Sequence, residues 1–420
     1  MGFLQPHERH GGGAGEGDVS SALRVLDDID VAGKRVVVRA DLNVPMRDGK
    51  VTDDMRVRHA AATLAELADK KAIVIVLSHF ERPCGKVVPD YSLAALQPAL
   101  EKSLQRNVWF VETDWRSGAH QAVLANASPG DILLMENTRF HPGEEDNDPA
   151  FSRTLADLGD IFVNDAFSVS HRAHASTEGI AHLLPSFAGR GMEAELVALD
   201  RALGEPVRPV GAVVGGAKVS TKIPVLENLV SRVDELIIGG GMANTFLHAK
   251  GINVGRSLCE PDFKETVERI LRRAAAHHCN IILPCDVIVA KEFAPNARHS
   301  VVDVRSVPSD AMILDIGPES VADIMEQFGD LKTLLWNGPV GAFETEPFGH
   351  GTFALAKCAA RLTQAGKLLT VAGGGDTVAA LSAAGVQNDF SYVSTAGGAF
   401  LEWLEGRGLP GVDALKMSHA

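Results

Sequence analysis

The sequence predicts an α/β protein with two doubly wound, parallel-sheet (Rossmann-like) domains joined by a hinge helix. Short, apolar, β-branched runs recur along the whole chain, and stretches with helical periodicity separate them. Strands that are apolar on both faces and alternate with helices are typical of parallel sheets covered on both sides. The runs are too numerous for one sheet of ordinary size, and 420 residues suffice for two domains, each with its own core.

The predicted strands share a run of Val, Ile or Leu that ends in polar or glycine residues. In chain order they are RVVVRAD (35–41), AIVIVLSH (72–79), DILLMEN (131–137), IFVND (161–165), GAVVGG (211–216), ELIIGGG (235–241), IILPCDVIVA (281–290), TLLWNG (333–338), LLTVAGGG (368–375) and YVSTAGG (392–398). Helical periodicity is clearest over residues 53–72 and 262–278.

The boundary between the domains is predicted in the segment that follows Gly191. Apolar residues at Met192, Leu196, Leu199 and Leu203 predict a helix that ends near Gly204. An ordinary surface helix within one domain has the same pattern. We expect the following organisation: 1–20 a disordered, glycine-rich extension, 21–191 the first domain, 192–207 the hinge helix, 208–403 the second domain, and 404–420 a segment that returns to the first domain.

The composition excludes several classes of protein. Apolar residues at 45% and charged residues at 22% indicate a soluble globular protein. A net charge of −14 argues against nucleic acid or an anionic membrane as the main partner, and no apolar run is long enough to span a membrane. The 5 cysteines lack C-x-x-C spacing, so we expect reduced thiols in the cytoplasm and no zinc site at His277–Cys279.

Basic side chains follow each predicted strand of the first half. Ligands of open α/β sheets bind beyond the carboxyl ends of the strands, so these positions are the ones to examine. They are Arg39, Asp41 and Asn43, then His79 and Arg82, then Glu136, Asn137 and Arg139, then Asp165, His171 and Arg172, with Arg56 opening a nearby helix. One such arginine is usually a solvated surface charge, but four successive basic clusters predict an anion-binding bowl. Guanidinium groups suit phosphate or carboxylate, which accept paired hydrogen bonds.

The strands of the second half end in glycine. Glycine lets backbone N–H groups approach an anion, and the positive ends of the following helices favour negative charge. Asp376 adds a carboxylate of the kind that a magnesium site uses. Neither G-x-x-x-x-G-K-[ST] nor G-x-G-x-x-G occurs, which argues against a P-loop NTPase or a nicotinamide dehydrogenase. The residues alone therefore predict a transferase, with an anionic acceptor in one half and a magnesium nucleotide in the other.

Several long motifs also carry a family resemblance. In order, VRADLNVP, SHFERP, ENTRFHPGEE, NDAFSVSHRAHAST, GGAKVSTKI, GGGMANTFL, WNGPVGAFE, GGGDT and STAGGA resemble the motifs of phosphoglycerate kinase, from about residue 22 onward. The resemblance implies reversible phosphoryl transfer from 1,3-bisphosphoglycerate to ADP, giving 3-phosphoglycerate and ATP. It implies Mg²⁺ bound with the nucleotide, a cytoplasmic monomer, and no nucleic-acid or membrane partner.

The resemblance also implies roles for individual residues. It places the glycerate substrate on Asp41, Asn43, Arg56, His79, Arg82, Arg139 and Arg172. It places the nucleotide on Lys218, Lys222, Asn337, Glu344, Gly373, Gly374, Gly375, Asp376 and Thr377, with Asp376 at the metal. It places four residues at the transferring group, namely Arg56, Lys218, Gly375 and Gly398. We expect His171 and His174 to pack against Arg172 and orient it.

The chain departs from the family pattern at four positions. Glu81, Ser168 and Ala396 stand where glycine is usual, and Ile313 replaces a glycine that lies near the adenine in relatives. None of these changes removes a charged ligand, so we expect them to alter affinities and not the activity. Another phosphotransferase on the same scaffold, or a non-catalytic relative, remains the alternative to this interpretation.

Overall fold

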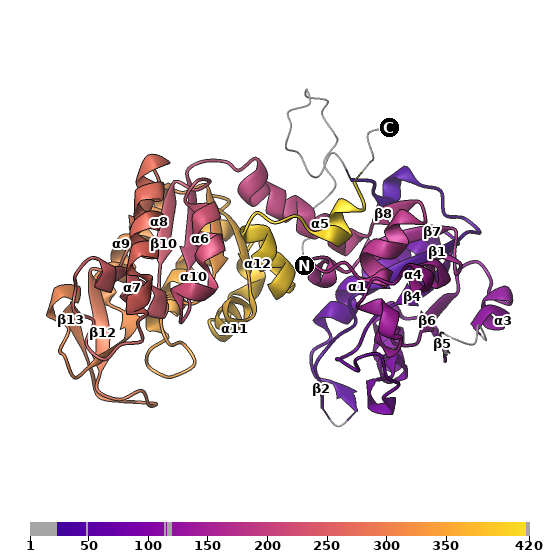
Figure 1. Cartoon of the computed structure of the whole chain (residues 1–420), viewed down its shortest axis with the longest axis horizontal. Coiled ribbons are helices and arrows are strands. Elements are labelled where there is room, and N and C mark those ends of the chain that lie inside the picture. The colour runs from indigo at the N-terminus through magenta and orange to yellow at the C-terminus, as the bar shows by residue number, and fades with distance from the viewer. Residues whose placement is uncertain (1–22, 48, 113–114, 116–119, 417–420) are drawn as a thin grey trace.

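The computed structural model describes residues 23–47, 49–112, 115 and 120–416. The glycine-rich extension expected over residues 1–20 lies outside them. The chain forms two lobes, each built on a six-stranded sheet whose strands are all parallel (Figure 1). The predicted fold class, α/β with two parallel sheets, is confirmed.

The sheet of the first lobe has the order β5-β6-β4-β1-β7-β8. Its strands, in that order, are Trp109–Val111, Ile132–Met135, Ile73–Leu77, Arg35–Ala40, Ile161–Asp165 and Ser186–Ala188. The helices of this lobe are α1 Met55–Asp69, α2 Gln97–Leu104, α3 His120–Ala125 and α4 Pro149–Ala156, and a small hairpin joins β2 Met46–Arg47 to β3 Lys50–Val51. Strands β5 and β8 are short edge strands that the sequence did not predict.

The sheet of the second lobe has the order β11-β10-β9-β15-β16-β17. Its strands, in that order, are Asn280–Ile282, Glu235–Ile238, Val210–Val214, Thr333–Asn337, Leu369–Gly373 and Tyr392–Ser394. The accompanying helices are α6 Ile223–Leu229, α7 Gly240–Ala249, α8 Lys264–Ala276, α9 Pro318–Asp330, α10 His350–Gln364, α11 Gly375–Ala383 and α12 Gly397–Leu404.

The prediction of one strand over residues 281–290 is wrong. The run breaks after β11, and β12 Asp286–Ala290 pairs antiparallel with β13 His299–Asp303 and β14 Met312–Ile316 in a separate three-stranded sheet. Pro284 has no N–H for a sheet ladder, so it interrupts pairing there. The Asp286 carboxylate then accepts hydrogen bonds from the backbone N–H groups of Glu319 (3.1 Å) and Ser320 (2.8 Å), which fixes the new direction of the chain.

The apolar spacing of the sequence explains how α1 packs. Val57, Ala60, Leu64 and Leu67 are buried, and their three- and four-residue spacing places them on one face of the helix. That face covers the sheet beside β1 and β4 and joins the core that contains Val36, Val38 and their neighbours. Arg56 lies in the first turn of the same helix, so packing of the buried face fixes the backbone position from which the Arg56 side chain extends.

Helix α5 (Arg190–Leu199), continued by one π-helical turn over Asp200–Gly204, runs between the lobes (Figure 1). Its predicted apolar positions Met192, Leu196, Leu199 and Leu203 are buried in a core that is shared with the second sheet. Its Glu195 is buried and accepts a hydrogen bond of 2.5 Å from the hydroxyl of Tyr392 on β17. Helix α5 therefore contacts both halves of the molecule.

The last described segment, up to Lys416, lies against the first lobe, as the yellow segment of Figure 1 shows. Helix α13 (Pro410–Asp413) makes two hydrogen bonds there: Gly411 N–H donates to Ser170 O (2.9 Å), and Asn164 Nδ2 donates to Gly411 O (3.0 Å). Leu23 also pairs with Lys416 in an isolated bridge. The lobes are thus connected covalently in two places, at α5 and after α12. No helix in the described part of the chain is long and apolar enough to cross a membrane.

Candidate active site

The carboxyl ends of neighbouring parallel strands bring the basic residues of the first half together. Strand β1 pairs with β4 on one side and with β7 on the other, with Arg39 opposite Leu77 and Asn164. The segments that follow these strands carry His79 and the residues from Ser168 to His174. The sheet therefore brings together, at the carboxyl ends of its strands, side chains that are more than 100 positions apart in the sequence.

Arg39 forms the buried floor of this bowl. Its Nε donates to Ser176 Oγ (2.9 Å), its Nη1 donates to Ala40 O (2.5 Å), and its Nη2 lies 2.9 Å from His79 Nδ1. Glu144, which is fully buried, accepts hydrogen bonds from the backbone N–H (3.1 Å) and hydroxyl (2.5 Å) of Ser176. Burial lowers the pKa of Arg39 to about 10, and the charge of Glu144 opposes that shift. With a pKa of about 10, Arg39 stays charged at neutral pH, and the charge of Glu144 offsets part of the effect of its burial.

The imidazoles of the bowl are neutral at neutral pH. Burial lowers the pKa of His174 to about 3, with the guanidinium of Arg139 as the next cause. Burial and the charge of Arg39 hold the pKa of His79 well below its usual value, and burial also lowers the pKa of His171. His174 Nδ1 is buried and has no hydrogen-bond partner among the described residues. The positive charge of the bowl therefore comes from its arginines, and the imidazoles fill the space between them without adding repulsion.

Arg56 reaches from the first lobe to the second. Its Nη1 donates to Asn43 O (2.8 Å) and lies 3.3 Å from Asp41 Oδ2, and its Nη2 donates to Thr395 O (3.2 Å). Thr395 follows β17, the edge strand of the other sheet. The guanidinium thus lies at the junction of the two strand-end clusters. Sequence reasoning did not identify the Thr395 carbonyl, because a backbone acceptor has no residue-type signal.

Glu81 shapes the bowl through its backbone. Its N–H donates to Asn43 Oδ1 (3.1 Å), and its carbonyl accepts from Arg139 Nη1 (2.8 Å). Its φ angle is +55°, in the left-handed region that favours glycine. Arg139 is buried and its Nε lies 3.3 Å from Glu145, whereas Arg82 is exposed and Arg172 half-buried. The carbonyl of Arg172 accepts hydrogen bonds from Thr177 Oγ1 (3.0 Å) and from His174 N–H (3.1 Å), so His174 holds the backbone of Arg172.

The glycine loops of the second half meet at the carboxyl ends of the strands of the second sheet. Helix α11 begins at Gly375, after Gly374 with a φ of +99° that glycine adopts readily. A Cβ built on Gly397, at the start of α12, would lie 3.9 Å from Gly375 N, so the two helix N-termini are neighbours. A Cβ on Gly398 would lie 3.2 Å from His171 Nε2, so the α12 terminus also contacts the first lobe.

Lys222 and Asn337 connect these loops. Lys222 Nζ donates to Gly215 O (2.6 Å), Asn337 Oδ1 (2.7 Å) and Asn337 O (3.1 Å). Asn337 Nδ2 donates to Gly373 O (2.8 Å), and the buried hydroxyl of Thr377 accepts from Gly338 N–H (2.7 Å). Burial lowers the pKa of Lys222 to about 8, and the nearby Asp376 carboxylate opposes the shift. These hydrogen bonds fix the relative positions of the glycine turns that follow β9, β15 and β16.

Four predicted nucleotide-side residues are exposed, namely Lys218, Glu344, Gly375 and Asp376. Among the residues that the structure describes, there is no group of three or more His, Cys, Asp or Glu side chains that could hold a metal. Mg²⁺ usually takes only one or two carboxylates from the protein and completes its shell with phosphate oxygens and water. Asp376, in the first turn of α11 beside Lys222, fits a metal ion that arrives with a nucleotide.

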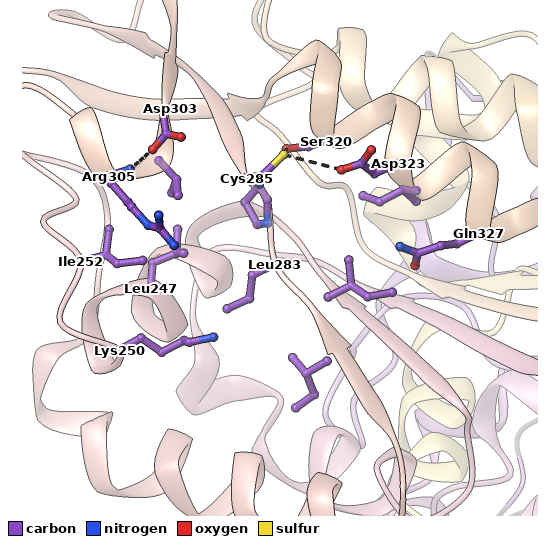
Figure 2. Close-up of a pocket in the computed structure, with 15 residues that line it drawn as sticks. Leu247, Lys250, Ile252, Leu283, Cys285, Asp303, Arg305, Ser320, Asp323 and Gln327 are labelled. Carbon is purple, nitrogen blue, oxygen red and sulfur yellow. Dashed lines mark hydrogen bonds between the residues drawn. The ribbon is translucent and has the colours of Figure 1, made fainter.

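A cavity of about 500 Å³ in the second lobe is lined by none of the predicted site residues (Figure 2). Figure 2 shows Lys250 and Arg305 on one side of it and Asp323 on the other, with Cys285 Sγ 3.7 Å from Asp323 Oδ2. Burial raises the pKa of the Cys285 thiol, so it stays protonated and unreactive at neutral pH. The glycine loops do not line this cavity.

The comparisons with known proteins agree with this geometry. The family model described as "Phosphoglycerate kinase" matches residues 26–407. The chain belongs to the phosphoglycerate kinase family. It is 61% identical over 396 residues to a phosphoglycerate kinase of Rhizorhabdus wittichii, covering 94% of the chain and 100% of the relative. It is 60% identical, with the same coverage, to one of Zymomonas mobilis.

A solved structure gives the same result. The phosphoglycerate kinase of Coxiella burnetii superposes with a TM-score of 0.87 at 43% identity, covering 94% of this chain and 98% of that one. The chain is therefore an enzyme, a kinase that transfers a phosphoryl group to or from the carboxyl group of phosphoglycerate in glycolysis. The family resemblance that the sequence motifs carried is confirmed.

Proposed function

We propose that the chain transfers a phosphoryl group reversibly between 1,3-bisphosphoglycerate and ADP, with the glycerate on the first lobe and the magnesium nucleotide on the second. The observation that carries this proposal is the position of Arg56. Its guanidinium starts on α1 of the first lobe and donates to Thr395 O of the second, between the basic bowl and the glycine loops. A phosphoryl group in flight between two such sites passes this cation.

The glycerate side is proposed to consist of Asp41, Asn43, Arg56, His79, Arg82, Arg139 and Arg172. Buried guanidinium groups beside neutral imidazoles support this assignment, because they present positive charge in a partly desolvated site where it acts strongly. Asp41 is the exception in sign. A carboxylate there would repel phosphate and accept a hydrogen bond from a hydroxyl, so we place the hydroxyl end of the glycerate at Asp41.

The nucleotide side is proposed to consist of Lys218, Lys222, Asn337, Glu344 and Thr377 together with Asp376 and Gly373 to Gly375. The converging N-termini of α11 and α12 support phosphate binding here, with Gly375 and Gly398 nearest the transferring group. When bound, Mg²⁺ supplies charge neutralisation to the nucleotide phosphates, and Asp376 would hold it. Exposed Glu344 would bind the ribose, and exposed Lys218 would reach toward Arg56.

The residues are suited to positioning and charge stabilisation, and no general base is required. The acceptor oxygen is a carboxylate in one direction and a phosphate in the other, and both are ionised at neutral pH. Arg56 and Lys218 would meet the equatorial oxygens of the phosphoryl group from opposite lobes. The neutral His79, His171 and His174 fit this view, because a proton-transferring imidazole would need a pKa near neutrality.

A coupled assay with 1,3-bisphosphoglycerate and ADP tests the activity. ATP formation that depends on both substrates is expected, and its absence with correctly folded protein would contradict the proposal. Titration calorimetry of 3-phosphoglycerate and ADP against each lobe's arginine or lysine variants tests the assignment of lobes. We further propose that the segment 192–207 acts as the hinge, with domains at 21–191 and 208–403. Small-angle scattering should then show a smaller radius of gyration with both substrates bound than with either alone.

We also propose that the enzyme is a cytoplasmic monomer without nucleic-acid or membrane partners. The net charge of −14 and the free state of Cys84, Cys259, Cys279, Cys285 and Cys358 support this view. Light scattering of the purified protein would measure the mass directly, and a value of twice 44.6 kDa would contradict the monomer.

A further inference from the structure

The carboxylate of Asp41 is held by groups from three parts of the first lobe. Ser168 Oγ donates to Asp41 Oδ2 at 2.5 Å, and the backbone N–H of Asn43 donates to Oδ1 at 3.3 Å. Arg56 Nη1 lies 3.3 Å from Oδ2. The side chain of Asp41 is 14% exposed, so little water is available to replace any of these partners. Among these contacts, the one with the Ser168 hydroxyl is the shortest.

We propose that Ser168 is a positioning residue that fixes the orientation of Asp41 and thereby the recognition of the hydroxyl group of the glycerate. This inference rests on the proposed function, because it deepens the assignment of Asp41 to the hydroxyl end of the substrate. Ser168 follows β7 in the short 3-10 helix Phe167–Val169, whereas Asp41 follows β1. The hydroxyl therefore ties together the ends of two neighbouring strands at the site.

The need for this contact follows from the double role of Arg56. Arg56 approaches Asp41, but a transferring phosphoryl group would attract the same guanidinium. A carboxylate held mainly by Arg56 would lose its orientation when the guanidinium turns toward that group. Ser168 cannot be drawn away in this manner, because a serine hydroxyl is uncharged and its short side chain is fixed to the β7 end. It keeps Asp41 in place while Arg56 moves.

The first experiment compares Ser168→Ala with Ser168→Thr, which keeps the hydroxyl. Because a hydrogen bond to a charged group contributes strongly, the KM for 3-phosphoglycerate should rise about tenfold in Ser168→Ala. The value of kcat should stay within about twofold, since Asp41 contacts the hydroxyl before and during transfer. Ser168→Thr should restore most of the affinity. Ser300→Ala, on the exposed edge strand β13, is the matched control and should change neither constant.

The second experiment asks whether the effect passes through the substrate hydroxyl. The probe is 3-phosphonooxypropanoate, which is 3-phosphoglycerate without its hydroxyl group, and binding is measured by calorimetry. Ser168→Ala should weaken 3-phosphoglycerate about tenfold and leave the affinity for the probe unchanged. In an Asp41→Asn background, the effect of Ser168→Ala on 3-phosphoglycerate should largely disappear, because the two residues act together.

Either of two results would overturn the inference. Equal weakening of 3-phosphoglycerate and of the probe would mean that Ser168 supports the bowl in general. A fall in kcat at constant KM would mean that it acts through Arg56. Failure of the proposed function gives a different result, because the unmodified enzyme would then neither turn over nor bind 3-phosphoglycerate. A shift in melting temperature measured alongside separates loss of folding from loss of positioning.

Discussion

The two halves of the proposed site differ in what would present charge to the ligand. In the first lobe, side chains do so: Arg39 and Arg139 are buried, the charge of buried Glu144 opposes the lowering of both arginine pKa values, and His79 Nδ1 lies 2.9 Å from Arg39 Nη2. In the second lobe, the backbone does so: glycine turns lead into helices whose N-terminal N–H groups converge, and Asn337 and Lys222 tie the turns together. The first half depends on a few charges, whereas the second depends on many small dipoles.

This difference predicts how each half responds to mutation. Removing one guanidinium from the bowl removes a positive charge that no neighbouring side chain replaces. Single substitutions should therefore have large effects on the binding of one ligand. In the proposed nucleotide site, several backbone N–H groups of the glycine turns would share the contacts with phosphate, and no side-chain substitution removes them. In the second half, therefore, the substitutions with the largest effect on activity should be those of side chains that extend beyond the loop backbone toward the ligand. Lys218, which is exposed, is the first of these to test.

The largest effect is expected for Lys218→Ala. If Lys218 meets the phosphoryl group mainly in the transition state, its removal should lower kcat on the order of 10²-fold and change KM little. Steady-state kinetics in both directions measures this, with Lys367→Ala as a control for loss of an exposed lysine in the same lobe. A rise in nucleotide KM at constant kcat would show instead that Lys218 binds ground-state phosphate.

Arg172→Ala should have the next largest effect, and only on one ligand. Loss of a charge-assisted hydrogen bond of roughly 1.5–3 kcal/mol should weaken 3-phosphoglycerate by about 10- to 100-fold and leave ADP affinity nearly unchanged. Arg139→Ala should weaken the same ligand and also lower the melting temperature, because Arg139 holds the carbonyl of Glu81. Calorimetry with each ligand separately decides the matter, with exposed Arg153→Ala as the control. Equal losses for both ligands would refute the assignment of the lobes.

The sequence predicted which residue types belong to each half of the site better than it predicted the contacts between them. Arginines at strand ends and glycine turns are visible as letters, so the bowl and the loops could be assigned to their lobes from residue types and spacing alone. The Thr395 carbonyl, the hydroxyl of Ser168 on Asp41, and the Glu144–Ser176–Arg39 chain could not be predicted, because they depend on how distant segments pack. The antiparallel sheet β13-β12-β14 could not be predicted either, because in the sequence β12 continues the apolar run of β11 across Pro284.

A smaller effect, and a pH-dependent one, is expected at Lys222. Burial lowers its pKa to about 8, so it loses its positive charge as the pH rises through 8, well before an ordinary lysine would. Because the protonated form attracts phosphate, ADP affinity should decrease several-fold between about pH 7 and pH 9.5. Lys222→Met should bind ADP about tenfold more weakly at pH 7 and show little further decrease, so the two curves approach each other at high pH. Parallel curves would mean that another group titrates.

The smallest effect is expected for Glu81, where two causes can be separated by two substitutions. Both Glu81→Gly and Glu81→Ala remove the carboxylate, but only glycine adopts the φ of +55° without steric cost. If the carboxylate repels the substrate phosphate, both variants should bind 3-phosphoglycerate modestly tighter at low salt, and the gain should fade as ionic strength rises.

The conformational cause should appear only in stability. Relief of the left-handed backbone should make Glu81→Gly more stable than Glu81→Ala by about 1 kcal/mol in denaturant unfolding. The backbone bonds of residue 81 to Asn43 and Arg139 are retained in both variants, so neither should lower kcat. Equal stability of the two variants would mean that Asn43 and Arg139 hold the turn so firmly that its strain is absorbed elsewhere. Unchanged affinity at low salt would show that the Glu81 carboxylate points away from the bowl and that its backbone alone serves the site.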